Sequence, residues 1–233
     1  MGCKLSVMSR KTMFRISALI SGVSGIVILA GVIYPIVSYN SASTKNYTKL
    51  ISPVSEKHAG AVKAVTSSQS VDYTQASNWF PGGAPKEDFV TSKVDYYTVI
   101  IPRLKIENAT VAIGGEDLSQ HIIQYPGTAL PGKRGNAVLF GHSTLPIFYN
   151  PKNHISIFSL LPTLRKGDQI FVNYDGISYT YRVEEMFEVK PTDIQVLDQD
   201  SSDSFLTLVT CVPPGDPSLP RRLIVRARVV LPQ

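Results

Sequence analysis

The feature that most constrains the fold is a long apolar segment near the N-terminus. Residues 16–39 read ISALISGVSGIVILAGVIYPIVSY, and no charged residue occurs between Arg15 and Lys45. A helix needs about 20 predominantly apolar residues to cross the hydrocarbon core of a bilayer. We therefore predict a transmembrane helix over residues 16–39, which separates a short N-terminal part from a long C-terminal part.

The charges on either side of this segment predict its orientation. Four basic residues precede it, namely Lys4, Arg10, Lys11 and Arg15. The positive-inside rule keeps such a basic flank in the cytoplasm, so we expect residues 1–15 to be cytoplasmic and everything after about Asn40 to be extracellular. The alternative is a cleavable signal peptide, whose apolar region normally runs for about 7–15 residues. The greater length found here favours a retained single-pass anchor in the cell membrane.

Residues 40–93 differ in composition from the segments on both sides. They are rich in Ser, Thr, Ala and Lys and show no sustained apolar–polar alternation, which favours an extracellular spacer. Near its end, residues 78–83 (NWFPGG) contain the only tryptophan of the chain. Two interpretations stay open: Trp79 and Phe80 pin the spacer to the following domain, or the segment covers an active-site groove as a lid.

From residue 94 onward, short β-type runs alternate with turn residues. The main runs are residues 96–102, 109–113, 136–140, 169–174, 178–189 and the two within 206–230. Asp175-Gly176, between two alternating runs, is a two-residue hairpin signal, and residues 155–164 have the spacing of a short helix or turn. Many short strands with little helix predict an all-β domain over residues 94–233, a closed β-barrel of about eight strands.

The last two apolar runs of the chain carry the clearest chemical signal. The first ends near Cys211, and the second opens on Arg221 and Arg222 after a loop of Pro, Gly, Asp and Ser. A guanidinium facing a thiol would lower the pKa of that thiol, because cationic surroundings favour the thiolate. The other cysteine, Cys3, lies on the predicted cytoplasmic side, so Cys211 is expected to be a lone thiol in an exported domain. Both a catalytic and an inert buried cysteine fit this pattern.

Four histidines are available to activate such a thiol. His58 falls in the predicted spacer, and His121 and His154 lie in loop-like polar surroundings. His142 directly follows the apolar run 136–140 and a glycine, which places an imidazole at a strand end where a groove would open. We rank His142 first, and keep His121 and His154 as alternatives together with a pure packing role.

Three motifs in this order resemble those of the sortases, the membrane-anchored cysteine transpeptidases of bacterial surfaces. Residues 207–211 (TLVTC) reproduce the TLxTC motif of that family. Residues 135–142 (GNAVLFGH) look like the segment that carries the sortase histidine, and residues 222–225 (RLIV) look like the strand that carries the sortase arginine. The resemblance extends over about residues 101–230 and follows an N-terminal anchor, which makes it specific.

This resemblance implies a sortase-like barrel with a catalytic site formed by His142, Cys211 and Arg222. Arg222 would also contact the substrate, together with Val209 and Thr210 beside the nucleophile. Thr210 could equally be no more than a β-branched strand former. For Arg222 the alternative is a solvated basic edge. Arg222 rather than Arg221 is chosen because it directly precedes the apolar run, on the opposite strand face from Leu223.

The resemblance also implies a reaction. Cys211 would attack an LPXTG-like C-terminal sorting motif of an exported protein, cleave after its Thr, and form a thioester that an amine resolves. His142 would protonate the departing amine and deprotonate the incoming one, while Arg222 would stabilise the developing oxyanion. The amine could belong to a cell-wall precursor or to a lysine of another protein. Residues 78–81 do not reproduce the Asp-Pro-aromatic lid motif of some pilin-polymerising sortases, so an anchoring role is preferred.

Two other functions fit the same residues. A cysteine protease or hydrolase that gives its acyl-enzyme to water would use the same residues, and a non-catalytic membrane-tethered binding barrel would only pack Cys211. The net charge of +5 comes with no nucleic-acid-binding module. We expect no cofactor or metal: calcium could be held by acidic residues, but the spacing of Glu184, Glu185 and Glu188 suits a solvated face equally well.

Overall fold

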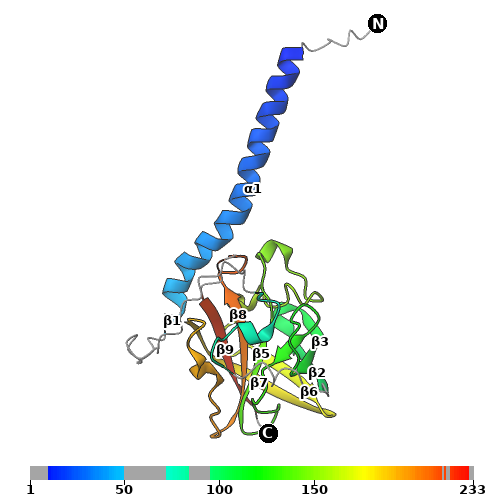
Figure 1. The fold of residues 1–233 in the computed structure, drawn as a ribbon, viewed down its shortest axis with the longest axis vertical. Coiled ribbons are helices and arrows are strands. Elements are labelled where there is room, and N and C mark those ends of the chain that lie inside the picture. Colours follow the sequence, from blue (N-terminus) through cyan, green and yellow to red (C-terminus); the bar gives the residue numbers. More distant parts are fainter. Residues whose placement is uncertain (1–9, 50–71, 84–94, 217, 219–220, 231–233) are drawn as a thin grey trace.

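The computed structural model describes residues 10–49, 72–83, 95–216, 218 and 221–230. They form one long helix that extends from one end of a small β-barrel (Figure 1). Residues 1–9 with Cys3, and most of the predicted spacer with His58, lie outside the described residues.

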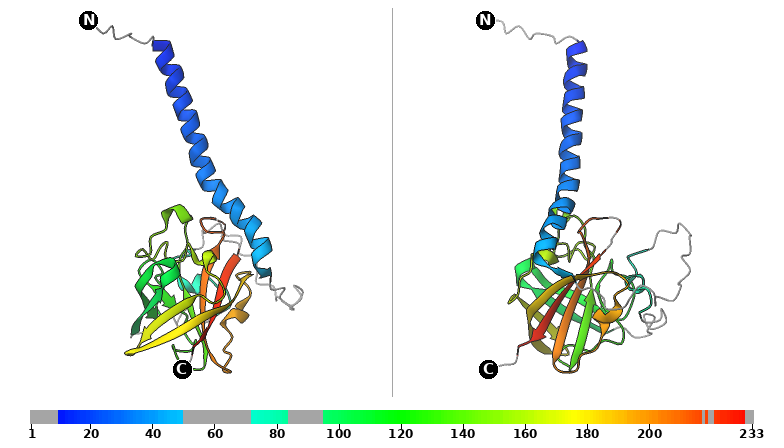
Figure 2. Two further views of the ribbon diagram at one scale, coloured as in Figure 1. Left: turned by 180° about the vertical axis from the view of Figure 1, so that it is seen from behind. Right: turned by 90° about the vertical axis from the view of Figure 1, so that its left-hand side faces the viewer.

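Helix α1 (Arg10–Asn46) contains the predicted transmembrane segment and extends beyond it at both ends. Its segment Arg10–Ser43 has the length and apolar character to cross a membrane, and its most apolar part is not buried against the barrel. A membrane anchor and an N-terminal signal sequence share these properties. Pro35 lies inside the helix, where a proline removes one backbone hydrogen bond and favours a bend, and the last turns lean away from the rest of the helix (Figure 2).

The barrel closes through eight strands, as predicted from the sequence. The sheet order is β1-β7-β6-β2-β3-β4-β5-β8-β9, and a further pairing of β7 with β9 closes the ring. The strands are β1 (Thr48–Lys49), β2 (Asp95–Ile101), β3 (Ile106–Ile113), β4 (Ile122–Gln124), β5 (Gly135–Phe140), β6 (Gln169–Tyr174), β7 (Ile177–Val189), β8 (Ser204–Val212) and β9 (Arg221–Val229). The short β1, just after the helix, adds to β7 in parallel.

Short 3₁₀ turns replace longer helices in the connections. They are η2 (Ala76–Asn78), η4 (Pro102–Leu104), η5 (Pro146–Phe148), η6 (Leu161–Thr163) and η7 (Ile194–Leu197). The predicted hairpin between β6 and β7 is confirmed. Asp175 and Gly176 both have positive φ, 51° and 75°, as the twist-matched two-residue turn requires.

Two apolar clusters bury the barrel wall on both of its faces. Alternation along β9 sends Leu223 and Val225 into the interior cluster, whereas Ile224 joins a second cluster with Trp79 and Phe80. Strand β8 is buried at all nine of its positions, which explains its nearly continuous apolar sequence.

The second cluster exists because part of the predicted spacer packs onto the barrel. We call residues 72–83 the cover segment. Its Gln75 forms a bridge with Asp117, the amide of Ala76 donates to the carbonyl of Glu116 (2.9 Å), and the amide of Leu118 donates to the carbonyl of Thr74 (2.9 Å). The cover segment is thus held by main-chain hydrogen bonds as well as by its aromatic side chains.

Candidate active site

Strand register places Cys211 and Arg222 directly opposite each other. They are cross-strand partners in the antiparallel pair β8–β9, so their side chains leave the sheet on the same face, with Cβ atoms about 4.5–5.5 Å apart. Cys211 is a free cysteine that is only 2% exposed, and Arg222 is fully buried. The face is the one turned toward the cover segment.

His142 reaches the same place from the other side of β8. Strands β5 and β8 run parallel with Phe140 opposite Val209, so His142, two residues beyond Phe140, is level with Cys211. The amide of Gly141 donates to the carbonyl of Val209 (3.2 Å) and continues the ladder past the end of β5. The three predicted catalytic residues therefore come together at one end of three adjacent strands.

Hydrogen bonds join residues 141–143, which we call the histidine turn, to strand β8, which carries Cys211. Thr210 Oγ1 donates to the carbonyl of Gly141 (2.8 Å), and Ser143 Oγ donates to the carbonyl of Cys211 (2.7 Å). A side chain at Gly141 would meet the ring of Phe158 at 2.5 Å, so this turn needs glycine. His142 Nε2 is buried and has no hydrogen-bond partner in the part of the chain that the structure describes.

Trp79 of the cover segment packs over this group. Its ring stacks on Phe140 at 5.4 Å between centroids and lies 5.8 Å from the ring of His142. The guanidinium carbon of Arg222 lies 5.4 Å from the Trp79 ring centroid and 5.5 Å from that of Tyr73. The carbonyl oxygen of Trp79 also accepts a hydrogen bond from Arg222 Nη2 (3.4 Å). One residue of the cover segment thus contacts both His142 and Arg222.

Burial under the cover segment favours neutral forms of the cysteine and the histidine. It raises the pKa of the Cys211 thiol to about 11, and the positive charge of Arg222 opposes this only in part. Burial also lowers the pKa of His142 below its ordinary value, against the opposing effect of the carboxylates of Asp117 and Asp72. At neutral pH the covered site therefore holds a thiol and an uncharged imidazole.

The other predicted site residues have different surroundings. His121 and His154 pack edge-on against each other with 5.9 Å between ring centroids, and His121 also packs on Tyr96. Val209 and Thr210 are fully buried and build the strand junction described above. Their role in substrate binding stays a prediction.

Four residues contribute to the site without having been singled out from the sequence. Ser143 donates a hydrogen bond to the carbonyl of Cys211. The carboxylates of Asp72 and Asp117 oppose the lowering of the His142 pKa, and the ring of Tyr73 lies against the guanidinium of Arg222. The position of Ser143, directly after the ranked histidine, was an available signal. Asp72, Tyr73 and Asp117 gave none, because they approach the site through contacts distant in sequence.

The acidic residues that were considered for calcium each face an arginine. The closest oxygen–nitrogen distances are 3.1 Å for Glu184–Arg228, 3.7 Å for Glu185–Arg226 and 2.5 Å for Glu188–Arg221. Among the described residues, no three His, Cys, Asp or Glu side chains gather in a way that could hold a metal ion. These three carboxylates are thus engaged in cross-strand or buried ion pairs.

The chain is similar to known proteins of one family. The family model "Sortase domain" matches residues 99–230. Sortase A of Streptococcus agalactiae serotype III (strain NEM316) is 29% identical over 117 residues, covering 50% of this chain and 45% of that protein. Sortase A of Staphylococcus aureus (strain NCTC 8325 / PS 47) is 30% identical over 100 residues, covering 37% of this chain and 47% of that protein. The chain thus spans less than half the length of these relatives.

Solved structures show the same barrel. Sortase C-1 from Actinomyces oris aligns with a TM-score of 0.51 and 27% identity, over 58% of this chain and 73% of that one. Sortase C-1 from Streptococcus pneumoniae aligns with a TM-score of 0.51 and 26% identity, over 59% of this chain and 67% of that one. Because the family model covers more than half of the chain and the closed barrel agrees with these structures, the chain belongs to the sortase family of transpeptidase enzymes.

Proposed function

We propose that this protein is a membrane-anchored sortase that cleaves an LPXTG-like C-terminal sorting motif of exported proteins and transfers the protein to an amine at the cell surface. The observation that carries the proposal is the strand register. It sets Cys211 between Arg222 on one neighbouring strand and His142 at the end of the other. The amine acceptor is a cell-wall precursor or a lysine of another protein.

In the first half of the reaction, the Cys211 sulfur attacks the carbonyl carbon of the motif's Thr. His142 takes the proton of the Cys211 thiol as the sulfur attacks and becomes an imidazolium. The peptide C–N bond then breaks, a thioester forms, and this imidazolium gives the proton to the departing amine. The Nε2 atom of His142, with no partner among the described residues, is the nitrogen available for that transfer. Arg222, always charged, stabilises the oxyanion that develops on the carbonyl oxygen.

In the second half, an incoming amine attacks the thioester carbonyl carbon. Neutral His142 accepts the proton of this amine, a new amide bond forms, and the Cys211 thiolate leaves. The imidazolium then returns its proton to the thiolate, so the cysteine and histidine regain their starting charges. Water in place of the amine would give hydrolysis, so the nucleophile that reaches the thioester decides between transfer and proteolysis.

Both steps require the cover segment to move. Cys211 is 2% exposed, in the same buried cluster as Trp79, and a thiol with a pKa of about 11 is ionised in roughly one molecule in ten thousand at pH 7. Displacing Trp79 would expose the thiol and reduce the burial that raises its pKa, while Arg222 would still favour the thiolate. The contacts of Trp79 with His142 and Arg222 support the lid interpretation of residues 78–83 over a purely structural one.

A transfer assay tests the proposal. The full chain in detergent is incubated with a library of peptides that vary around LPXTG, with and without an added amine, and products are resolved by mass spectrometry. We expect a peptide–amine product that depends on both substrates, and none from Cys211→Ala. Cleavage that the amine neither accelerates nor diverts would show a hydrolase instead, and equal products from the wild type and Cys211→Ala would exclude catalysis by this thiol.

A further inference from the structure

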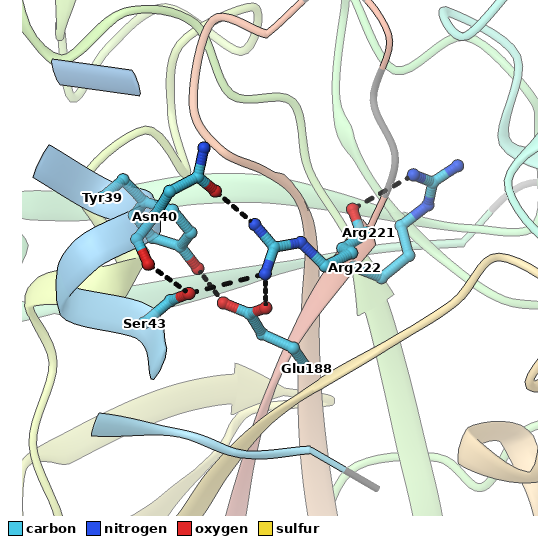
Figure 3. Close-up of polar contacts among 6 residues, drawn as sticks. All are labelled: Tyr39, Asn40, Ser43, Glu188, Arg221 and Arg222. Carbon is cyan, nitrogen blue, oxygen red and sulfur yellow. Dashed lines mark hydrogen bonds and ion pairs between the residues drawn. The ribbon is translucent and has the colours of Figure 1, made fainter. Parts of the chain in front are cut away.

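The last turns of α1 are fastened to the barrel by a buried ion pair. Glu188, near the end of β7, is only 4% exposed, and its Oε2 lies 2.5 Å from Nη1 of Arg221, the first residue of β9. The hydroxyl of Tyr39 donates to the other carboxylate oxygen, Oε1, at 2.8 Å. Figure 3 shows that the carboxylate lies between the helix and the first residues of β9.

Arg221 also binds the helix directly. Its Nη2 donates to Asn40 Oδ1 at 2.6 Å and its Nη1 donates to Ser43 Oγ at 3.4 Å. We call Tyr39, Asn40, Ser43, Glu188 and Arg221 the clamp. Its helical residues begin at Tyr39, the last residue of the apolar segment, so the clamp forms where the chain would leave the membrane.

Two further contacts secure the same end of the helix. The hydroxyl of Tyr47 donates to the carbonyl of Pro162 (2.9 Å), and β1 pairs with β7 at Phe187 and Glu188. The helix end is therefore held against the barrel at several points.

The clamp is continuous with the candidate active site. Arg222 Nη1 donates to the main-chain carbonyl of Arg221 (3.3 Å), a bond drawn in Figure 3. In the β7–β9 register, Glu188 pairs with Leu223 and Val189 pairs with Arg222. A fixed Arg221 side chain therefore holds the main chain from which Arg222 extends. It also holds the carbonyl oxygen of Arg221, which accepts a hydrogen bond from the Arg222 guanidinium.

The chemistry of the clamp makes this hold strong. A carboxylate that is nearly excluded from water is stable only with its countercharge and donors in place, and removing one partner leaves an unpaired buried charge. Glu188 receives both a charged and a neutral donor. The start of β9 follows a Pro-rich loop, so the ion pair adds to the strand ladder in holding its position.

We propose that Glu188 and Arg221 are positioning residues for Arg222, and that the end of α1 completes the clamp, so that the membrane anchor is part of the working site. This inference rests on the proposed role of Arg222 in catalysis. The end of the barrel that carries Cys211 and Arg222 is also the end to which the helix docks.

The test compares two ion pairs between the same two strands. The full chain carrying Glu188→Gln is assayed for kcat and KM of transfer beside Glu185→Gln. The Glu185 side chain is 55% exposed, and its Oε1 lies 3.7 Å from Nη1 of Arg226. We expect Glu188→Gln to lower kcat by about tenfold to a hundredfold, since small displacements of a catalytic group have effects of that size. Glu185→Gln should leave kcat unchanged. Tyr39→Phe should lower kcat in the same direction but less, because it removes one neutral donor.

A double variant distinguishes a positioning role of Glu188 from simple destabilisation of the fold. If Glu188 acts through Arg222, then adding Glu188→Gln to Arg222→Lys should cause no further fall in kcat, whereas independent effects would multiply. Equal kcat values for Glu188→Gln and Glu185→Gln, or multiplied effects in the double variant, would overturn the clamp while the wild type remains active. A wild type no more active than Cys211→Ala would instead overturn the proposed function and, with it, the premise of the clamp.

Discussion

At the scale of single residues, burial works against the chemistry that the motif suggests. The sequence places Arg222 beside Cys211, which alone would lower the pKa of the thiol. In the folded chain, burial outweighs this attraction, and the pKa of the thiol rises to about 11. The cysteine is therefore kept protonated until something displaces the cover segment.

Thiol labelling at varied pH tests this residue-scale prediction. Because the thiolate is the reactive form, the rate at which a methanethiosulfonate reagent modifies Cys211 should rise about tenfold per pH unit between pH 8 and pH 10 in the wild type. Trp79→Ala removes the ring above His142 and Arg222, so labelling should be faster at every pH and its midpoint should move to lower pH. The rates are measured by mass spectrometry of the full chain.

Phe80→Ala is the matched control, since it shortens an aromatic side chain of the same cover segment that packs on Phe140 rather than on Arg222. A midpoint that Trp79→Ala leaves in place, or that Phe80→Ala moves equally, would contradict a specific role of Trp79.

At the scale of elements, the site is made by the ends of three strands and the bonds that tie them. Thr210 links β8 to the histidine turn. Earlier on the same strand, and away from the catalytic end, Thr207 Oγ1 donates to Asn136 Oδ1 at 2.6 Å. The two threonines are buried on one strand and use their hydroxyls alike, but only Thr210 bonds beside His142.

Replacing each threonine by valine separates stability from activity. Both Thr210→Val and Thr207→Val leave a buried acceptor without its donor, so each should lower the free energy of unfolding by about 1–3 kcal/mol, measured by urea denaturation. Only Thr210→Val should also lower kcat/KM, since it frees the turn that positions His142. Equal losses of activity in both variants would show that Thr210 contributes stability alone.

At the scale of the whole molecule, the helix and the barrel meet at the catalytic end. The positive flank before the helix favours a cytoplasmic N-terminus, which would place the barrel outside the cell. Because α1 docks through the clamp, the barrel would then be held close to the extracellular face of the cell membrane.

Cysteine accessibility in intact cells tests this topology. Ile177, 53% exposed in the β6–β7 hairpin, is changed to cysteine in a Cys211→Ala chain, and a membrane-impermeant maleimide is applied. We expect Ile177→Cys to be labelled in intact cells. The native Cys3 serves as the internal control and should be labelled only after permeabilisation. The reverse pattern would contradict the predicted orientation, and release of the barrel into the medium would show a cleaved signal sequence.

The sequence by itself was sufficient for the features that depend on neighbouring residues or on a short ordered motif. The apolar segment predicts the helix, Asp175-Gly176 predicts the hairpin, and alternation along β9 predicts that Arg222 and Leu223 face opposite ways. The motifs around Cys211 and His142 indicate the family, because the chemistry requires those residue types in that order. Strand β4, with only three residues, is too short to give a periodic signal and is not among the runs predicted from the sequence.

Only the tertiary structure decided what covers the site and what holds it. Trp79 bonds to Arg222 across 143 positions of the chain, and Tyr39 reaches Glu188 across 149. No local sequence pattern predicts either contact, because each depends on how the barrel closes and where the helix docks. The protonation of Cys211 and His142 follows from the same packing, since burial, rather than the neighbouring charges, has the larger effect on their pKa values.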